Sequence, residues 1–103
     1  MVTYSADPAF KAFADPTRRA VLEYLAGKPH NVNELAEKFD VSRPAISKHL
    51  RLLKDARVVR ERRDGRNRIY EINPEGLKAI REYFDQFWSH ALDAFKKAVE
   101  KRS

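Results

Sequence analysis

The fold is decided by the stretch Val41-Ser42-Arg43-Pro44-Ala45-Ile46-Ser47-Lys48-His49-Leu50-Arg51-Leu52-Leu53. Three apolar residues in it, Ile46, Leu50 and Leu53, follow the i, i+4, i+7 spacing that puts side chains on one stripe of a helix. Ser42 suits the N-cap position, because its hydroxyl accepts a hydrogen bond from a first-turn amide that has no partner within the helix. Pro44 is tolerated in that turn, because those amides need no intrahelical partner. The stretch therefore predicts a short helix with one buried face.

The opposite face of this helix is polar and basic. A small hydroxyl such as that of Ser47 lets the helix approach the major groove of DNA closely. The Arg and Lys side chains of the same face can then contact phosphates or guanine edges. The alternative is a surface helix with a solvated basic face, and the surrounding chain favours DNA. We expect His49 to orient against a phosphate or to pack at the groove edge, since the sequence brings no carboxylate or nucleophile near it. The candidate DNA contacts here are Ser42, Arg43, Pro44, Ser47, Lys48, His49 and Arg51.

The charge of the chain is unevenly distributed. The 103 residues are 43% hydrophobic, which predicts one domain with a modest core, and the net charge is +6. Residues 42–68 carry ten Lys and Arg against three acids, and the rest of the chain carries eleven against twelve. All of the excess positive charge thus lies in one stretch, as expected for a surface that binds a polyanion.

Several classes of protein are disfavoured by what the sequence lacks. It has no apolar run long enough for a transmembrane helix and no signal-peptide core at its N-terminus, so we expect no membrane partner. Without cysteine there is no disulfide framework and no thiolate metal site, which agrees with a cytoplasmic location. With only three glycines and no phosphate-cradling loop, we expect no catalytic residues and no cofactor.

The chain before the quoted stretch contains two Asp-Pro pairs, at 7–8 and 15–16. An acidic N-cap followed by proline at the first helical position is a frequent way to start a helix. The first pair therefore predicts a short helix over residues 8–14, which carries two aromatic residues, Phe10 and Phe13.

The second pair predicts a helix over residues 16–26, on which Arg18 and Arg19 are expected to make local ion pairs rather than phosphate contacts. Asn31 and Glu34 then have the spacing of a capping box, which predicts a helix ending at Phe39. A short connection leads from there into the quoted helix. Two short helices joined in this way form a helix-turn-helix.

After the quoted helix, which is expected to end near Ala56, residues 58–72 predict a β-hairpin. Asp64-Gly65 suits a two-residue turn with positive φ. Exposed arginines can protect a sheet edge from aggregation, but four around one turn exceed that need, so contact with phosphates or the minor groove is favoured. The candidate DNA contacts of the hairpin are Arg62, Arg63, Arg66, Asn67 and Arg68.

Asn73-Pro74 is expected to cap a final helix that runs to about Val99 and is roughly 39 Å long. Its apolar stripe comprises Leu77, Ile80, Phe84, Phe87, Ala91, Leu92 and Phe95, widened by Tyr83, Trp88 and Val99. The stripe could pack entirely within the chain, but its width exceeds what one small core can bury, so we expect a symmetric dimer. The candidate interface residues are Phe10, Phe13, Phe84, Phe87, Trp88, Ala91 and Phe95.

Taken together, these motifs resemble the ArsR/SmtB family of winged-helix repressors over nearly the whole chain. The likeness is carried by residues 13–19, Glu34-Leu35-Ala36, residues 41–50 and Asp64-Gly65-Arg66. It implies a homodimer, joined by the terminal helices over residues 8–14 and 74–99, that binds a short palindromic operator and represses transcription.

Members of this family often sense metals, and here the likeness fails. The family's Cys-x-Cys after Glu-Leu is replaced by Ala36-Glu37-Lys38. His90 and Asp93 match half of a second family site, but no Asp-x-His precedes them on the last helix, and Asp85 and His90 should point to different sides. We therefore expect no metal site, because carboxylate and imidazole ligands need a complete set.

A second departure concerns Arg57, where the family usually has glycine at the end of the recognition helix. Glycine suits a left-handed residue that closes a helix. Arg57 must either adopt that conformation at a cost of about 1 kcal/mol or end the helix differently. If Arg57 is left-handed, the favourable interaction of its positive charge with the helix C-terminus offsets part of this cost.

The sequence thus predicts a mainly α (α+β) fold, a single winged helix-turn-helix DNA-binding domain over residues 1–103 with a two-stranded hairpin wing and a long C-terminal helix. The expected partners are double-stranded DNA and a second copy of the chain, with an unknown small-molecule or protein effector left open. The alternatives are a metal- or ligand-responsive repressor of the same family, and a basic module that binds a protein or RNA.

Overall fold

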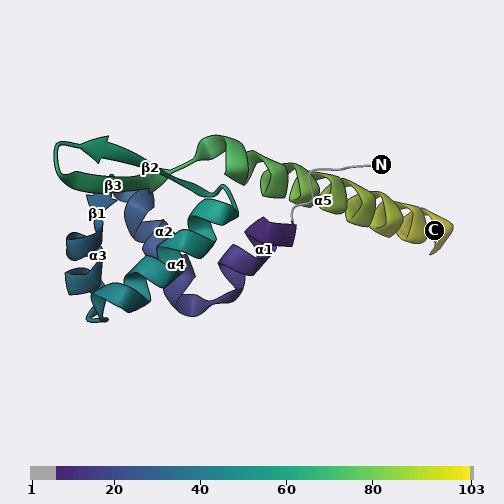
Figure 1. The fold of residues 1–103 in the computed structure, drawn as a ribbon. Helices are drawn as coiled ribbons and strands as arrows, with labels where there is room; N and C mark the ends of the chain where they lie inside the picture. Colours follow the sequence, from purple (N-terminus) through teal and green to yellow (C-terminus); the bar gives the residue numbers. More distant parts are fainter. Residues whose placement is uncertain (1–6, 103) are drawn as a thin grey trace.

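A computed structural model describes residues 7–102 of the chain, and Figure 1 shows its elements. In order these are α1 (Asp7–Ala14), α2 (Pro16–Gly27), β1 (His30–Asn31), α3 (Val32–Phe39), α4 (Arg43–Asp55), β2 (Val59–Asp64), β3 (Asn67–Ile72) and α5 (Pro74–Arg102). The chain is mainly helical with a small antiparallel sheet. The predicted winged helix-turn-helix is confirmed.

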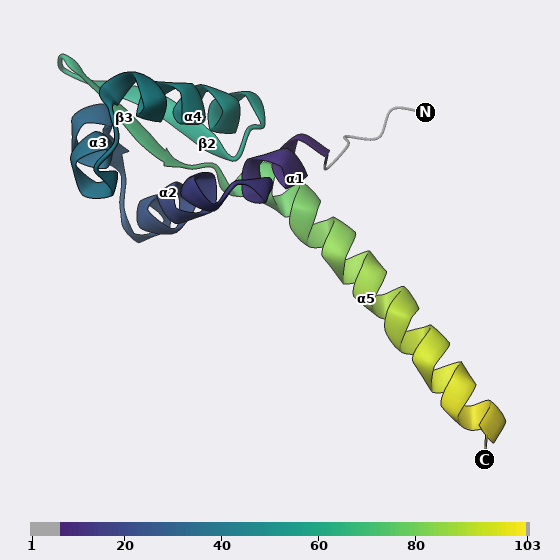
Figure 2. The same cartoon turned by 90° about the horizontal axis from the view of Figure 1, so that it is seen from below.

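The elements form a compact body and a projecting arm. Helices α1 to α4 and the sheet make the body, while α5 leaves it and extends well beyond it (Figures 1 and 2). None of the helices in the described part of the chain is both long and apolar enough to span a membrane.

The core of the body lies beneath α4, as the periodicity predicted. Ile46, Leu50 and Leu53 are all fully buried. They pack in one cluster with buried residues of the other body elements, namely Ala9, Ala12, Val21, Leu22, Leu25, Leu35, Val58, Val59 and Tyr70. Burial of the apolar stripe of α4 therefore directs the polar face of the same helix toward solvent.

Three predicted helix caps are present. The Ser42 hydroxyl accepts a hydrogen bond from the Ala45 amide at 3.3 Å, and Asp15 caps α2 in the same way. Asn31 and Glu34 complete the capping box, because each side chain accepts from the other residue's amide, at 2.8 and 2.9 Å. These caps satisfy amides that the helices themselves leave unpaired.

The hairpin turn lies one residue later than predicted. Asp64 pairs with Asn67 across the strands, so the central turn residues are Gly65 and Arg66 rather than Asp64 and Gly65. Gly65 has φ of +64°, and the turn has no other residue with positive φ. A two-residue turn that requires positive φ only at its first position takes glycine there and tolerates arginine next.

The sheet has a third strand that the sequence did not predict. The two residues of β1 pair with Ile69 and Tyr70 of β3, which gives the strand order β1-β3-β2. Two residues are too few to show a strand periodicity, and Asn31 is also the N-cap of α3. The strand ties the helix-turn-helix to the hairpin.

Arg18 and Arg19 have structural roles, with different partners from those predicted. Arg18 donates to the carbonyl oxygens of Lys11 and Ala12 at 2.8 and 3.3 Å, and Arg19 donates to that of Phe13 at 2.7 Å. These carbonyls belong to the last turn of α1, where acceptors lack helical partners and cations are favoured. The two arginines thus fasten α1 to α2.

The junction between α4 and α5 centres on Arg57, which is left-handed with φ of +62°, the first of the two alternatives that the sequence left open. Asn73 precedes α5 as predicted. Its backbone oxygen accepts from the Gly76 and Leu77 amides, while its side-chain amide donates to the Arg57 carbonyl at 2.9 Å. A Cβ at Gly76 would collide with the same carbonyl oxygen. The first turn of α5 is therefore packed directly on this backbone, and the helix ends at Arg102 instead of near Val99.

Candidate nucleic-acid interface

The outer face of α4 is polar, basic and open to solvent. All but one of the predicted contact residues on it are exposed: Ser42, Arg43, Pro44, Ser47, Lys48 and Arg51. The exception is His49, which is half-buried. Because the opposite stripe of α4 is fully buried, the helix is fixed to the body with its basic face directed outward.

His49 does have a carboxylate in its surroundings, contrary to the expectation from the sequence. Asp15, the N-cap of α2, has its pKa lowered first by the hydrogen bond from the Arg18 amide and further by the charges of Arg18 and His49. The sequence could not show this, because Asp15 and His49 are far apart along the chain. His49 therefore lies toward α2 at the edge of the basic face.

The hairpin has two faces with different charge environments. Residues that pair directly across antiparallel strands share a face. Val59 and Tyr70 are buried in the core, so the inner face of the hairpin, which also carries Glu61, Arg63 and Arg68, is the one directed toward the helices. Its outer face carries Arg60, Arg62, Ile69 and Glu71.

On the outer face, Glu71 binds two arginines. Its carboxylate oxygens accept from Arg60 Nε at 3.0 Å and from Arg62 Nε at 2.6 Å. Hydrogen bonds from Arg62 and then Arg60 hold the pKa of Glu71 below its usual value. Arg62, predicted as a DNA contact, is thus tied to a carboxylate on the face directed away from α4.

On the inner face, Glu61 bridges the hairpin and α4. Its Oε1 accepts from Lys54 Nζ at 3.0 Å, and its Oε2 accepts from the Tyr70 hydroxyl at 2.9 Å and lies 3.6 Å from Arg68 Nη1. Hydrogen bonds, first from Lys54 and then from Tyr70, lower the pKa of Glu61. The pKa of Tyr70 is raised, first by its own burial and then by its hydrogen bond to Glu61. Glu61 is therefore ionised at neutral pH.

These groups line a hollow of about 470 Å³ between α4 and the hairpin. Arg43, Ser47, Arg51 and Lys54 reach it from α4, and Arg68 reaches it from β3. Sequence reasoning missed Lys54, although it follows Ser47 by seven residues and so lies on the same helical face. It missed the role of Glu61 because that role depends on the strand register.

The tip of the hairpin concentrates positive charge. Arg63 and Arg68 are direct cross-strand partners, an arrangement in which like charges repel. Across residues 7–102, neither Arg63 nor Arg66 forms an ion pair with a carboxylate. Arg66 and Asn67 are exposed beside them. An anion bound at the tip would offset this repulsion.

The arm carries most of the predicted apolar stripe exposed, but the first two residues of that stripe, Leu77 and Ile80, pack against the core. Seven large side chains on α5 are between 45% and 67% exposed: Tyr83, Phe84, Phe87, Trp88, Leu92, Phe95 and Val99. Phe10 of α1 adds to this surface through edge contacts with Tyr83 and Phe84, at ring-centre distances of 5.1 and 5.6 Å. Phe13 instead packs against the core of its own chain.

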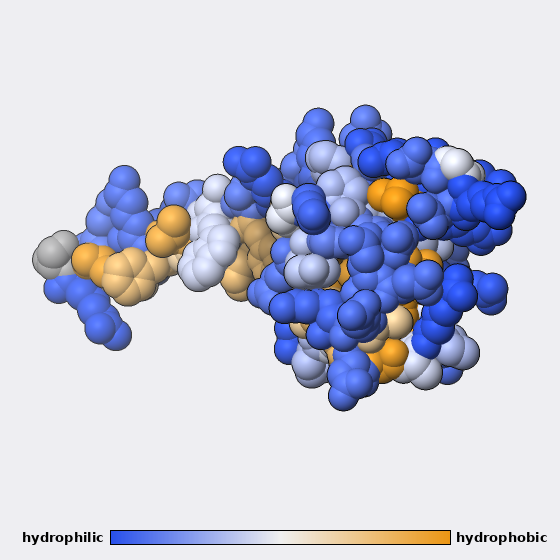
Figure 3. All heavy atoms as spheres, turned by 90° about the vertical axis from the view of Figure 1, so that its left-hand side faces the viewer, coloured by the Kyte–Doolittle hydropathy of each residue, from blue (hydrophilic) through white to orange (hydrophobic). Residues whose placement is uncertain are grey.

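Figure 3 shows the same contrast over the surface. Apolar side chains gather along the projecting arm, while polar ones cover most of the facing side of the body. Farther along the arm, Ala91 is also exposed.

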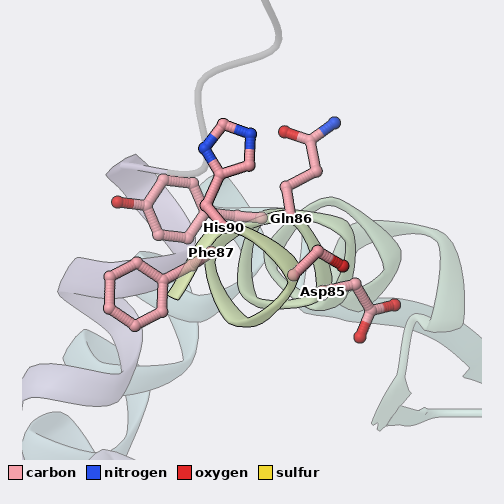
Figure 4. Close-up of a pocket in the computed structure, with 6 residues that line it drawn as sticks. Asp85, Gln86, Phe87 and His90 are labelled. Atoms are coloured by element: carbon pink, nitrogen blue, oxygen red, sulfur yellow. The ribbon is translucent and has the colours of Figure 1, made fainter. Parts of the chain in front are cut away.

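The candidate metal ligands of α5 do not converge on one side of the helix (Figure 4). His90 and Asp85 leave the helix on different sides (Figure 4), as their spacing predicted. Across residues 7–102, no three His, Asp or Glu side chains form a group that could hold a metal ion.

The chain is similar to known regulators of transcription. A family model described as a helix-turn-helix domain matches residues 13–62. The HTH-type transcriptional regulator Rv2034 of Mycobacterium tuberculosis is 48% identical over 101 residues, which are 97% of this chain and 94% of that protein. The transcriptional repressor SdpR of Bacillus subtilis is 44% identical over 67% of this chain and 77% of its own length. A crystal structure of an ArsR family transcriptional regulator has a TM-score of 0.76 at 36% identity, over 86% of this chain and 94% of the other.

Proposed function

The chain belongs to the ArsR family of DNA-binding transcriptional regulators, and from this premise we propose that it is a homodimeric repressor of a palindromic operator. The observation that carries the proposal is the helix α4, whose apolar stripe is fully buried while its opposite face presents cations and a small hydroxyl. This is what a helix needs in order to lie in the major groove.

In the proposed complex, Arg43 and Ser47 contact base edges from the first half of α4. Lys48, Arg51 and Lys54 bind phosphates on either side, which fixes the register of the helix without reading sequence. His49 packs at the groove edge. The wing contributes Arg63, Arg66, Asn67 and Arg68 to the backbone or the minor groove. Arg62 contributes little because it lies on the outer face of the hairpin, directed away from α4.

The proposed dimer interface is the apolar stripe of α5 together with Phe10. A surface of seven exposed large apolar residues is unusual for a monomer and is typical of a surface that binds another protein. A two-fold axis through α5 would bring two copies of the same stripe together. Such a dimer would set its two α4 helices about 34 Å apart, one turn of DNA, and would account for a palindromic operator.

A footprinting experiment tests the sequence specificity. Small repressors often control their own operon, so the first probe is the DNA upstream of the protein's own coding sequence. We expect protection of a short palindrome that persists in excess random duplex. Protection that random duplex removes, or tighter binding to RNA or to an acidic protein, would replace the proposal with the basic interaction module. The proposal also entails a cytoplasmic location, where the operator of such a repressor lies.

A further inference from the structure

The carboxylate of Glu61 is a negative charge placed within the positive surface. It accepts hydrogen bonds from Lys54 of α4 and Tyr70 of β3 at 3.0 and 2.9 Å, and Arg68 lies 3.6 Å away. Its side chain is only 18% exposed, whereas those of Lys54 and Arg68 are 52% and 60% exposed. The two cations therefore reach solvent while the acid that holds them is largely enclosed.

Stability alone gives a weak account of this arrangement. Ion pairs with an exposed partner contribute little to folding, because water already solvates the charges and the long side chains lose freedom. A carboxylate facing a polyanion also repels it. The main physical effects of Glu61 are to cancel positive charge in the hollow and to fix the directions of Lys54 and Arg68.

We propose that Glu61 is a specificity-determining residue of the DNA-binding surface, which weakens sequence-independent binding more than it weakens operator binding. The inference rests on the proposed function. Binding to random DNA is almost entirely a matter of cations meeting phosphates. Lys54 and Arg68, held by Glu61, cannot follow the phosphates of any duplex freely.

Operator binding depends on Glu61 differently. An operator complex has a fixed geometry and adds base contacts from Arg43 and Ser47. A smaller share of its binding free energy therefore comes from the two cations that Glu61 restrains. A neutral residue at position 61 would free two cations for any DNA sequence, so the ratio of operator affinity to random affinity would fall. Glu61 thus acts through Lys54 and Arg68, as a positioning residue.

The hairpin offers a matched control in Glu71. This carboxylate also accepts from two cations, at 3.0 and 2.6 Å, and is 19% exposed. It lies on the opposite face of the hairpin, directed away from α4. Glu61→Gln and Glu71→Gln therefore make the same change of charge in similar surroundings, and only the first alters the hollow.

The experiment measures the affinity of the full chain for its footprinted operator and for a random duplex between about 50 and 200 mM salt. We expect Glu61→Gln to tighten random binding by roughly threefold to tenfold at low salt and to steepen its salt slope by about one to two. Operator affinity should change less. Glu71→Gln should leave both affinities close to wild type, and Glu61→Asp, which keeps the charge, should retain the wild-type slope.

Melting curves verify that each variant is folded. A folded Glu61→Asp chain with a steeper salt slope than wild type would show that the negative charge at position 61 is not what restrains the two cations. Unchanged random binding in Glu61→Gln, or an equal change in Glu71→Gln, would overturn the inference while leaving the proposed function intact. A wild-type chain that does not prefer its operator to random duplex would instead overturn the proposed function.

Discussion

Helices α4 and α5 are both amphipathic, yet they use their apolar stripes differently. The stripe of α4 is fully buried, and that of α5 is about half exposed along most of its length. Helix α4 is surrounded by α1, α3 and β2, whereas α5 contacts α1 near its base and then leaves the body (Figure 2). Periodicity shows that a helix has a face to bury, and the surrounding elements decide whether its own chain can bury it.

Length explains the difference. The 29 residues of α5 span about 43 Å, more than one side of a small body can cover. We therefore assign the buried stripe of α4 to folding and the exposed stripe of α5 to association with a second copy. The predictions below test this division, from the largest expected effect to the smallest.

Truncation of the α4 stripe should act on folding itself. Leu50→Ala removes a fully buried side chain and leaves a cavity, so the free energy of unfolding should fall by about 2–5 kcal/mol. Denaturant unfolding of the variant measures this loss. A loss below about 1 kcal/mol would mean that α4 is not the centre of the core.

A charge in the α5 stripe should act on association. Phe87→Glu would bury an unpaired charge in the proposed interface, so it should split the dimer and abolish operator binding together. The body should remain folded, because Phe87 is 54% exposed in the single chain. Sedimentation and operator binding measure the two effects.

Gln86→Glu is the control, because it adds the same charge at the adjacent residue, which leaves α5 on another side (Figure 4). It should remain a dimer. Equal dissociation of both variants would show that net charge, and not the stripe, governs association.

Substitution on the outer face of α4 should change recognition of the operator sequence without changing dimer formation. Ser47→Ala should cost about 1–3 kcal/mol in operator affinity and relax specificity at one base position. The dimer should be unaffected, since Ser47 lies on the exposed face of α4 and is not part of the α5 stripe. Affinities for a panel of singly substituted operators provide the test, and a uniform loss across the panel would reassign Ser47 to the phosphates.

The smallest effect concerns Arg57, between the two helices. Because Arg57 is left-handed, Arg57→Gly should relieve strain and raise the free energy of unfolding by up to about 1 kcal/mol. Loss of its charge should weaken DNA binding uniformly across sequences. If the variant melts lower and binds equally well, Arg57 trades no stability for affinity.

Local signals predicted α4 well, because its Ser42 cap and apolar stripe are features of one short segment. The exposed stripe of α5 was also predicted, from its width and length. Features that depend on pairing between distant segments were not: β1 exists only through β3, and the hairpin turn was misplaced by one residue. The link from Lys54 to Glu61 was missed because it requires both the helix face and the strand register.

The most direct test of the division between α4 and α5 is the mass of the unmodified chain in solution. Sedimentation equilibrium at micromolar concentration should give a single species of twice the 12.0 kDa chain mass. A species of 12.0 kDa under the same conditions would contradict the assignment of the α5 stripe to a second copy of the chain.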